Sequence, residues 1–254
     1  WDFGDGTPPV TVISMLPLPP PGQHIWTAAG IYNVQLITVA IGANCPGDTI
    51  MLPVCIEDKI VTSINVTDTI GCSPVTPNIT NMSDTVTYCT SIIKGWFVDN
   101  PNGWNLTGGS TLSDLEPNFN FTDAGIYTLS YYQFNNCGGD TISQKIYVRD
   151  VPTVDIPPTV QHCDTAFINT LTNTPHHPIF TDNGAPITSY LWRISPSVPF
   201  TLGTDSTFQY PSFMLSPNTY TITVFATNAC GTDSAVQTVV VNQITNGGFV
   251  MDID

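Results

Sequence analysis

Two aspartates stand at the beginning of the chain, in the hexapeptide WDFGDG of residues 1–6. Carboxylate oxygens are ligands that Ca²⁺ prefers, so Asp2 and Asp5 are candidate calcium ligands. The same stretch suits a turn, because Gly4 and Gly6 tolerate a positive φ and an aspartate there hydrogen-bonds the turn backbone. We expect the turn, and calcium is the alternative.

The four histidines are not spaced as metal ligands. His176 and His177 are adjacent, and neighbouring side chains of an extended chain point apart. His162 lies beside Cys163, but no second Cys-His pair completes a zinc site. We therefore expect these residues, and His24, to belong to the fold or to surface loops, and we expect no cofactor.

Motifs that indicate catalysis are missing from the sequence. It contains no G-x-S-x-G, H-E-x-x-H, Walker or dinucleotide-binding pattern. Glu57 and Glu116 are the only glutamates, and neither lies in an apolar stretch that would raise its pKa for acid catalysis. We expect no catalytic residues and no enzyme.

The composition indicates an acidic β-protein. Five Lys and Arg face 20 Asp and Glu, and the formal net charge is −15, which disfavours nucleic acid and anionic lipid as partners. No apolar run reaches the roughly 20 residues of a membrane span. Charged residues make up 10% of the chain while Thr, Asn, Ser, Pro and Gly are abundant, which favours strands and turns. Seven cysteines indicate an oxidising, extracellular compartment.

A repeat of roughly 95 residues organises the chain. Three segments, beginning at Ala29, Ala124 and Pro217, share a tyrosine, an alternating strand, an Asn-rich turn with a cysteine, and a second alternating strand. Each segment predicts a β-hairpin. A tryptophan precedes each hairpin at an even spacing, which predicts six core residues: Trp1, Trp96, Trp192, Tyr32, Tyr127 and Tyr220.

Short strands, a tryptophan on a middle strand and a tyrosine early in a late strand predict an all-β fold of immunoglobulin-like sandwiches in a linear array. Residues 123–127, DAGIY, have the form of a tyrosine corner. The repeats predict units at 1–58, 59–150 and 151–243, followed by a linker or the start of a further repeat at 244–254.

The first repeat resembles the polycystic-kidney-disease (PKD) repeat. The residues that carry the resemblance are WDFGDG at 1–6, HIW at 24–26 and AGIYNVQLITV at 29–39. Residues 71–83, which lead to Trp96, resemble the opening half of the same repeat in surface adhesins and gliding-motility proteins of the Bacteroidota. Repeats two and three lack the Gly-Asp-Gly turn after Trp96 and Trp192.

Repeat one begins at its middle-strand tryptophan, so the strands that precede it in the other repeats are missing from its sequence. We expect the natural polypeptide to continue upstream. The alternative is that a neighbouring chain donates these strands, as in β-strand addition.

The cysteines allow two pairing schemes. Pairing within repeats would join Cys72 with Cys137 and Cys163 with Cys230. The first turn and the late hairpin turn of a sandwich lie at opposite ends, however, and a disulfide needs Cα atoms within about 7 Å. A staggered scheme joins Cys72 with Cys230 and Cys55 with Cys89 across the junctions between repeats, and we favour it. Cys55 and Cys89 can alternatively be buried free thiols.

Two kinds of glycosylation signal occur. An O-glycosylation signal that resembles the one on exported proteins of the same phylum is present at Thr49, Thr69, Thr85, Thr141, Thr165, Ser206 and Ser234. Five N-glycosylation sequons lie at Asn65, Asn78, Asn81, Asn105 and Asn120.

We therefore expect a non-catalytic stalk or spacer segment of a secreted adhesin or surface filament, whose partners are neighbouring repeats and surface glycans or other cells. One alternative is a carbohydrate-binding or spacer module of a secreted hydrolase, using aromatics such as Trp104 and Tyr132. Another is a fibre subunit that self-assembles by strand donation.

Overall fold

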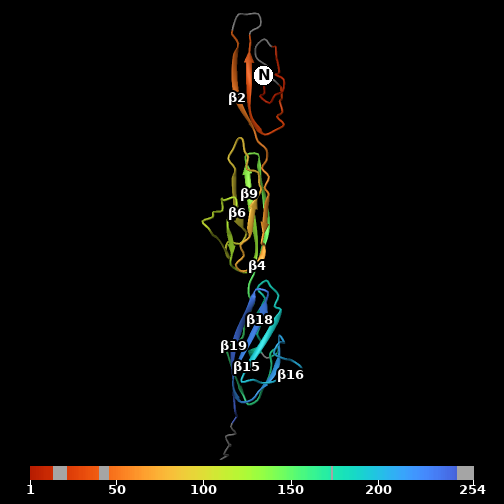
Figure 1. The fold of residues 1–254 in the computed structure, drawn as a ribbon, viewed down its shortest axis with the longest axis vertical. Helices are drawn as coiled ribbons and strands as arrows, with labels where there is room; N and C mark the ends of the chain where they lie inside the picture. The colour runs from red at the N-terminus through yellow and green to blue at the C-terminus, as the bar shows by residue number, and fades with distance from the viewer. Residues whose placement is uncertain (14–21, 40–45, 173, 245–254) are drawn as a thin grey trace, which may run out of the picture.

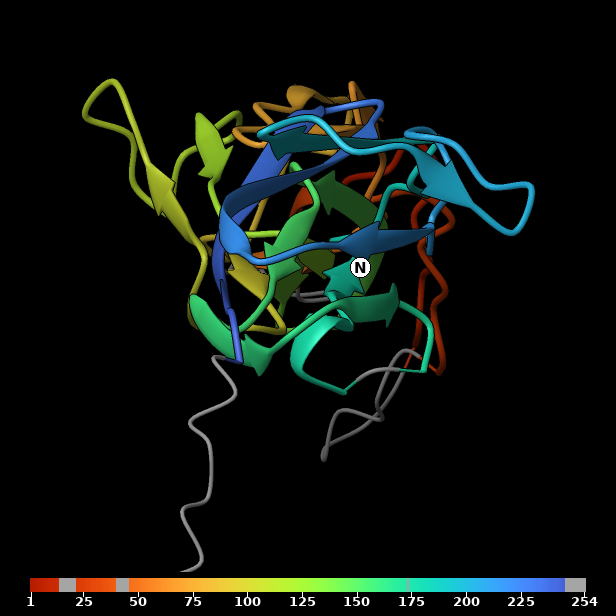
Figure 2. The same ribbon diagram turned by 90° about the horizontal axis from the view of Figure 1, so that it is seen from below.

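The computed structural model describes residues 1–13, 22–39, 46–172 and 174–244. Three units follow one another along one long axis, from the red and orange unit through the yellow and green unit to the cyan and blue unit (Figure 1). Seen from below, the units overlap in projection (Figure 2). The chain is thus an extended array, as expected from its repeats.

The first unit is built around one long hairpin. Strand β1 (Gly30–Thr38) pairs antiparallel with β2 (Asp48–Ile56) in a register that runs from Gly30 opposite Ile56 to Thr38 opposite Asp48. The opening residues add a bridge to the free edge of β1, where Asp2 and Gln35 exchange two backbone hydrogen bonds of 2.9 and 2.8 Å.

The second unit is a sandwich. Its main sheet has the order β4-β10-β9-β6, and the shorter pairs β3-β5 and β7-β8 lie outside that sheet. The strands are β3 (Ile64–Thr67), β4 (Ile70–Cys72), β5 (Asn78–Asn81), β6 (Ile93–Val98), β7 (Trp104–Leu106), β8 (Phe119–Phe121), β9 (Gly125–Asn135) and β10 (Gly138–Arg149). Aromatic and aliphatic side chains between the layers form one buried cluster that includes Trp96, Phe121, Tyr127 and Leu129.

The third unit repeats this design. Its main sheet has the order β12-β19-β18-β15, opposed by β13-β17-β16 and the pair β11-β14. The elements are β11 (Thr153–Asp155), β12 (Thr159–Cys163), β13 (Ala166–Asn169), the 3-10 helix η1 (Thr174–His176), β14 (Ile179–Thr181), β15 (Ser189–Ser195), β16 (Phe200–Thr201), β17 (Ser212–Leu215), β18 (Asn218–Asn228) and β19 (Gly231–Asn242). A second buried cluster includes Trp192, Phe213, Tyr220 and Ile222.

The strand order confirms the immunoglobulin-like class. In both sandwiches an early strand runs parallel to the last strand (β4 with β10, β12 with β19), and the late hairpin then pairs with the strand that carries the tryptophan. This arrangement is that of an immunoglobulin-like sheet. The two sandwiches therefore share one topology as well as one sequence period.

The three repeats also share one register. In each, the residue after the tryptophan lies opposite the third residue after the tyrosine, which gives the pairs Asp2 with Gln35, Phe97 with Ser130, and Arg193 with Thr223. The connection between tryptophan and tyrosine is shorter in repeat three. Because the paired positions do not shift, the length difference is absorbed by the loops and leaves the core unchanged.

Every repeat has a tyrosine corner. The hydroxyl of Tyr127 donates to the carbonyl of Asp123 at 2.8 Å, four residues upstream. Tyr32 donates to Ala28 at 2.9 Å and Tyr220 to Ser216 at 3.1 Å in the same way. This bond holds the entry of the late hairpin against its own first strand, so the element expected at 123–127 recurs in all three repeats.

The tryptophans of the two sandwiches are core residues, with 2% of their surface exposed. Their indole N–H groups donate to the loop carbonyls of Asp114 (3.0 Å from Trp96) and Phe208 (3.1 Å from Trp192). The expectation that Trp1 and Tyr32 are core residues is wrong, because both are only half-buried. No second sheet faces the hairpin within the described residues, so Phe3 packs there in their place, 6% exposed.

We predict that Tyr127→Phe lowers the free energy of unfolding of repeat two by about 1 kcal/mol, because a half-buried carbonyl loses its donor while the ring still fills the core. Urea unfolding followed by hydrogen exchange of β9 measures the change. Tyr132→Phe, on the outer face of the same strand, is the matched control. An equal loss in both variants would contradict the role assigned to the corner.

Candidate functional site

The opening turn uses both of its aspartates internally. The Asp2 carboxylate accepts from the Gly4 N–H at 2.9 Å, and the Asp5 carboxylate accepts from the Thr7 N–H at 3.1 Å and its hydroxyl at 2.6 Å. Gly4 has φ +72°, and a Cβ there would lie 2.8 Å from the carbonyl oxygen of Asn33. Glycine is therefore required for the turn to approach β1.

Asp5 also fixes the one histidine of the first unit. Its second carboxylate oxygen lies 2.9 Å from Nε2 of His24, whose ring stacks on Phe3 with centroids 3.9 Å apart and packs edge-on against Trp26. The hydrogen bond from the Thr7 hydroxyl is the main reason that the pKa of Asp5 falls to about 2. These contacts make the turn a structural element, and the described residues contain no group of three or more potential metal ligands.

Two histidines of repeat three, His162 and His176, belong to a polar network whose centre is buried. Gln237 donates through Nε2 to the carbonyls of Pro157 (2.9 Å) and Pro175 (2.6 Å), so its Oε1 must accept from Nδ1 of His176 at 2.6 Å. Nε2 of His176 is then an acceptor, and Nε2 of His162 donates to it at 2.7 Å. Burial lowers the pKa of His176, which keeps the ring neutral in this role.

His177 lies apart from that network. Its Nδ1 is 2.9 Å from the carbonyl oxygen of Thr170, and its ring stacks on Tyr210. The adjacent histidines thus point to different partners. Both have packing roles in the structure.

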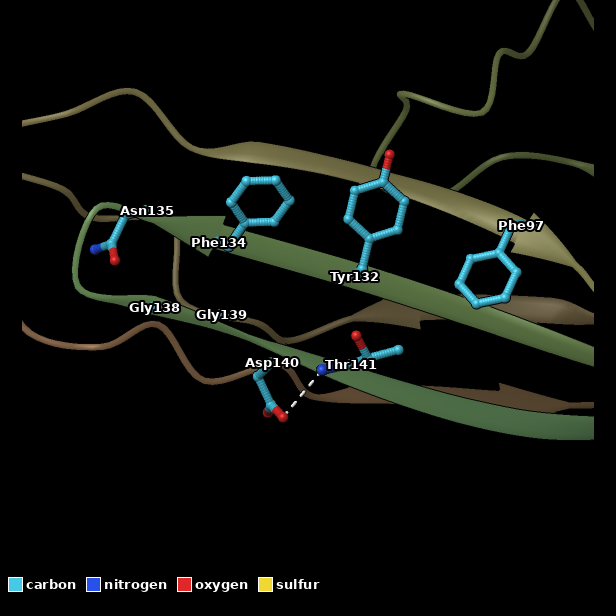
Figure 3. Close-up of a pocket in the computed structure, with 8 residues that line it drawn as sticks. All are labelled: Phe97, Tyr132, Phe134, Asn135, Gly138, Gly139, Asp140 and Thr141. Carbon is cyan, nitrogen blue, oxygen red and sulfur yellow. Dashed lines mark hydrogen bonds between the residues drawn. The ribbon is translucent and has the colours of Figure 1, made fainter.

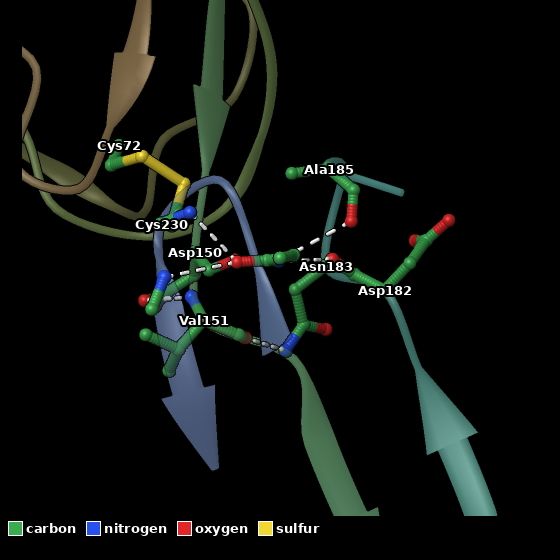
Figure 4. The surroundings of a disulfide bond; sticks show 9 residues. Cys72, Asp150, Val151, Asp182, Asn183, Ala185 and Cys230 are labelled. Atoms are coloured by element: carbon green, nitrogen blue, oxygen red, sulfur yellow. Dashed lines mark hydrogen bonds between the residues drawn. A yellow bond between two sulfur atoms is a disulfide. The ribbon is translucent and has the colours of Figure 1, made fainter. Parts of the chain in front are cut away.

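A disulfide joins repeats two and three. Cys72, the last residue of β4, is bonded to Cys230 in the turn between β18 and β19, with Cα atoms 5.4 Å apart (Figure 4). The bond connects two residues 158 positions apart in the sequence. It therefore ties the base of one sandwich to the top of the next.

Asn228 stabilises the same junction without a covalent bond. Its side-chain N–H groups donate to the carbonyls of Asp150 (2.7 Å), Asp182 (3.1 Å) and Ala185 (3.3 Å). Its Oδ1 accepts from the backbone N–H of Cys230 at 2.8 Å, which shapes the hairpin turn. One buried amide thus connects the hairpin turn, the inter-repeat segment and a loop of repeat three.

The segment between the repeats has a second set of hydrogen bonds at Asn183. Its side chain donates to the carbonyl of Val151 at 2.8 Å, and its own carbonyl accepts from the Asp150 N–H at 3.0 Å. Asn183 and Asn228 therefore both hydrogen-bond the segment of Asp150 and Val151, which restricts bending between the sandwiches.

The first junction uses the same elements. A disulfide joins Cys55, in β2, to Cys89, with Cα atoms 5.7 Å apart. Asn135, the counterpart of Asn228, donates to the carbonyl of Asp58 at 2.9 Å and accepts from the Cys137 N–H at 2.9 Å. The repeated pattern shows that this turn is built to contact the preceding inter-repeat segment.

Glu57 adds a hydrogen-bond cluster beside the first disulfide. Its carboxylate accepts from the Thr90 hydroxyl at 2.7 Å and from the backbone N–H groups of Tyr88 and Cys89 at 3.3 Å. The Thr90 hydroxyl is the main cause of the lowered pKa of Glu57. This glutamate holds the loop of repeat two against the end of repeat one.

The staggered cysteine scheme is the one present in the structure, and neither within-repeat pair forms. Cys137 and Cys163 are free and exposed, and Cys45 lies outside the described residues. Asn135 and Asn228 were not singled out from the sequence, and Glu57 was considered only as a possible acid catalyst. The recurrence of Asn-x-Cys-Gly at 135–138 and 228–231 was the available signal for the two asparagines.

A row of aromatic side chains lies on the outer face of β6 and β9. Phe97 and Phe134 are 47% and 39% exposed, and Tyr132 lies between them with centroid distances of 6.4 and 6.1 Å (Figure 3). These three residues, the aromatic face, line an open hollow of about 620 Å³ together with Asn135, Gly138, Gly139, Asp140 and Thr141. A Cβ at Gly95 would lie 2.7 Å from the Tyr132 hydroxyl, so the ring covers that glycine.

The other aromatic suggested for sugar stacking is placed differently. Trp104 packs against Phe119 with ring centroids 5.5 Å apart, and its indole N–H donates to the Asn100 carbonyl at 2.7 Å. It is a half-buried edge of the core of repeat two. Only Tyr132 of the two lies on the aromatic face.

The glycosylation signals differ in exposure. Two O-glycosylation positions, Thr69 and Ser206, are half-buried. The other five are exposed: Thr49, Thr85, Thr141, Thr165 and Ser234. Among the sequons, Asn65, Asn78 and Asn105 are exposed while Asn81 and Asn120 are half-buried. The Asn81 side chain donates to the Leu115 carbonyl at 3.3 Å and accepts from the Ser83 N–H at 2.9 Å, so it is already engaged.

No protein-family model and no curated protein matches the sequence. Among solved structures, the chain is similar to a three-domain titin fragment with an E-to-A substitution (12% identity over 85% of this chain and 75% of that one, TM-score 0.42). It is also similar to immunoglobulin domains 1–5 of Sidekick-1 (13% identity over 85% and 46%, TM-score 0.30). These likenesses support no argument about ancestry or ligands, and the fold class follows from the strand order.

In the part of the chain that the structure describes, no helix has the length and apolar character needed to cross a bilayer.

We predict that Asn228→Ala lowers the free energy of unfolding of repeat three by about 2 to 4 kcal/mol, because the buried Ala185 carbonyl and several less buried backbone groups lose their partner together. Hydrogen exchange of β18 across a urea series measures the change. Asn218→Ala, at the exposed start of the same strand, should change stability by only about 0.5 kcal/mol. Similar effects of the two substitutions would show that the junction amide has no special role.

Proposed function

We propose that this chain is a stalk segment of a secreted surface adhesin or filament, with repeats at 1–58, 59–150 and 151–243 and a linker or the start of a further repeat at 244–254. Its work in this proposal is mechanical and non-catalytic: sandwiches joined end to end hold a distal site away from the cell. The observation that carries the proposal is the Cys72–Cys230 disulfide, which spans the junction between the two sandwiches.

The disulfide determines where a pulling force travels. A load applied to the two ends of the chain reaches Cys72 from the N-terminal side and passes directly to Cys230 through the sulfur–sulfur bond. Residues 90–229, which include most of both buried cores, lie in a closed covalent loop between the two disulfides and carry none of it. Unfolding inside the loop therefore cannot lengthen the stalk.

The first junction extends the same protection. Cys55–Cys89 closes a loop of 34 positions around the connection between repeats one and two. The hydrogen bonds of Asn135 and Glu57 restrict bending at the same place. Both connections are thus limited in extension by a covalent bond and in bending by polar contacts, as a spacer requires.

We assign the first repeat to the PKD type and the parent protein to surface proteins of the kind exported by the Bacteroidota. The Asp5–His24–Phe3 contacts give a packing reason for the WDFGDG and HIW motifs that carry the resemblance. Two disulfides fit an extracellular location, because such bonds persist in oxidising compartments. We propose O-linked glycan at the exposed signals, where it would shield strand edges from pairing with other chains.

The aromatic face favours a second function, contact with carbohydrate. Exposed aromatic rings stack on the apolar faces of sugars, and polar groups at the rim of the hollow would orient the hydroxyls. The Asp140 carboxylate accepts from the N–H and hydroxyl of Thr62 at 3.1 and 2.8 Å. The Asn135 side chain is engaged with Asp58 and Cys137, so the exposed Thr141 is the freer polar side chain of the rim. This contact would serve an adhesin or a hydrolase accessory module alike.

We predict that single-molecule stretching from the two ends shows no extension of the loop between Cys72 and Cys230 until a reductant is added. Reduction should release up to about 570 Å of contour length, from 158 positions at ~3.6 Å each. Cys72→Ser should lengthen the curve without reductant, and its contour should stop 34 positions short of the reduced wild type because Cys55–Cys89 stays closed. Cys163→Ser should not lengthen it. Full extension of the unreduced wild-type chain would contradict the mechanical proposal.

We predict that Tyr132→Ala reduces retention of the chain on a polysaccharide affinity gel at least tenfold for any polysaccharide that retards the wild type, because the central ring of the row is lost. Tyr147→Ala, which removes a tyrosine from β10 of the same sheet, is the control. Absence of retardation by a panel of cellulose, xylan, mannan and chitin polymers would remove the carbohydrate function and leave the stalk function intact.

A further inference from the structure

Cys163 occupies the same structural position as Cys72. Each is the last residue of a strand that runs parallel to the final strand of its sandwich, opposite Asn242 and Arg149 respectively. The next residue in each case donates its backbone N–H to the carbonyl of that opposing residue at 2.7 Å. The two backbones therefore present their sulfur atoms at the same end of the sandwich.

The junction between repeats two and three shows which element pairs with a cysteine at this position. Cys72 is bonded to the Cys230 turn, and that turn is placed by Asn228 on the carbonyl of Asp150. The counterpart of Asp150 in repeat three is Gln243, since Arg149 and Asn242 are equivalent. The free, exposed thiol of Cys163 thus has the place that Cys72 has in its junction with the Asn-x-Cys-Gly turn of Cys230.

A second observation concerns the turn itself. Cys137 is the equivalent of Cys230, and it too lies at a junction. Its thiol sulfur is 3.1 Å from the carbonyl oxygen of Glu57, and the side chain of Asn135 donates a hydrogen bond to the carbonyl of Asp58. The turn therefore seats on the preceding inter-repeat segment even where its cysteine is free. Docking of the turn therefore does not require a disulfide through its own cysteine.

We propose that Cys163 is a linkage site, which forms a disulfide with the Asn-x-Cys-Gly hairpin turn of a further immunoglobulin-like sandwich placed end to end against repeat three. This inference rests on the proposed stalk function in one respect, because both require another repeat to follow repeat three in the array. The Cys72–Cys230 bond would then be one step of a regular staggered series.

The bond requires an oxidant, and a small-molecule disulfide such as oxidised glutathione is sufficient. The thiolate of one cysteine attacks the small disulfide and releases one small thiol, which forms a mixed disulfide. The second cysteine attacks the protein sulfur of that mixed disulfide and releases the second small thiol. Two protein thiols are thereby oxidised to one disulfide, and one small disulfide is reduced to two thiols.

The test is a fusion in which a second copy of residues 151–243 follows Gln243 of the full chain. After refolding with oxidised and reduced glutathione, peptide mapping without reduction should find Cys163 joined to the Cys230 of the appended copy, with the original Cys72–Cys230 bond intact. Both cysteines should become resistant to alkylation. Asn228→Ala in the appended copy alone should reduce the yield of the new bond, because the turn loses its contact with Gln243.

Three results would overturn the proposal: Cys163 remaining open to alkylation while Cys72–Cys230 forms, Cys163 pairing with any other cysteine, or an equal yield with and without the Asn228→Ala change. Hydrogen exchange of β18 in the appended copy verifies that the copy is folded when the mapping is read. Failure here would leave the stalk function standing, because the stretching experiment depends on Cys72–Cys230 alone.

Discussion

The contact of each late hairpin turn with the segment that precedes its repeat is the constraint on which the array depends. In each of repeats two and three, the late hairpin has a first strand of 11 residues and a second strand of 12 residues. Its turn therefore reaches the end of the sandwich and meets the neighbouring repeat. There an asparagine amide bonds the inter-repeat carbonyl, Asp58 in one junction and Asp150 in the other. A buried amide must find partners, so the neighbouring repeat is held in one place.

Covalent bonds build on that contact in different ways at the two junctions. Cys72–Cys230 uses the hairpin turn directly, whereas Cys55–Cys89 joins the last strand of repeat one to a loop of repeat two. The polar contact is shared and the disulfides are not. The asparagine therefore defines the geometry of the junction, and each disulfide limits how far the junction can be pulled apart.

Features of the core recur from repeat to repeat, whereas features of the surface differ. Tryptophan, tyrosine corner and register are repeated closely, while loop length, the aromatic face of repeat two and the histidine network of repeat three differ between units. In repeats two and three the invariant side chains lie between the sheets, where any change in volume is costly. The variable features lie in loops and on the outer sheet face, where they can acquire a ligand without disturbing the array.

The sequence by itself determined the all-β class, the period, the hairpins and the tyrosine corner, because alternation and spacing along the chain encode which side chains face the core. Cysteine spacing with a length argument also favoured pairs across junctions. Only the tertiary structure decided that Trp1 and Tyr32 stay half-buried, that Trp104 packs inward while Tyr132 faces outward, and that Asn135 and Asn228 connect the repeats. These outcomes depend on which elements meet in space. The recurring Asn-x-Cys-Gly motif marks the two asparagines, but it does not identify the carbonyls 77 and 78 positions away that accept from them.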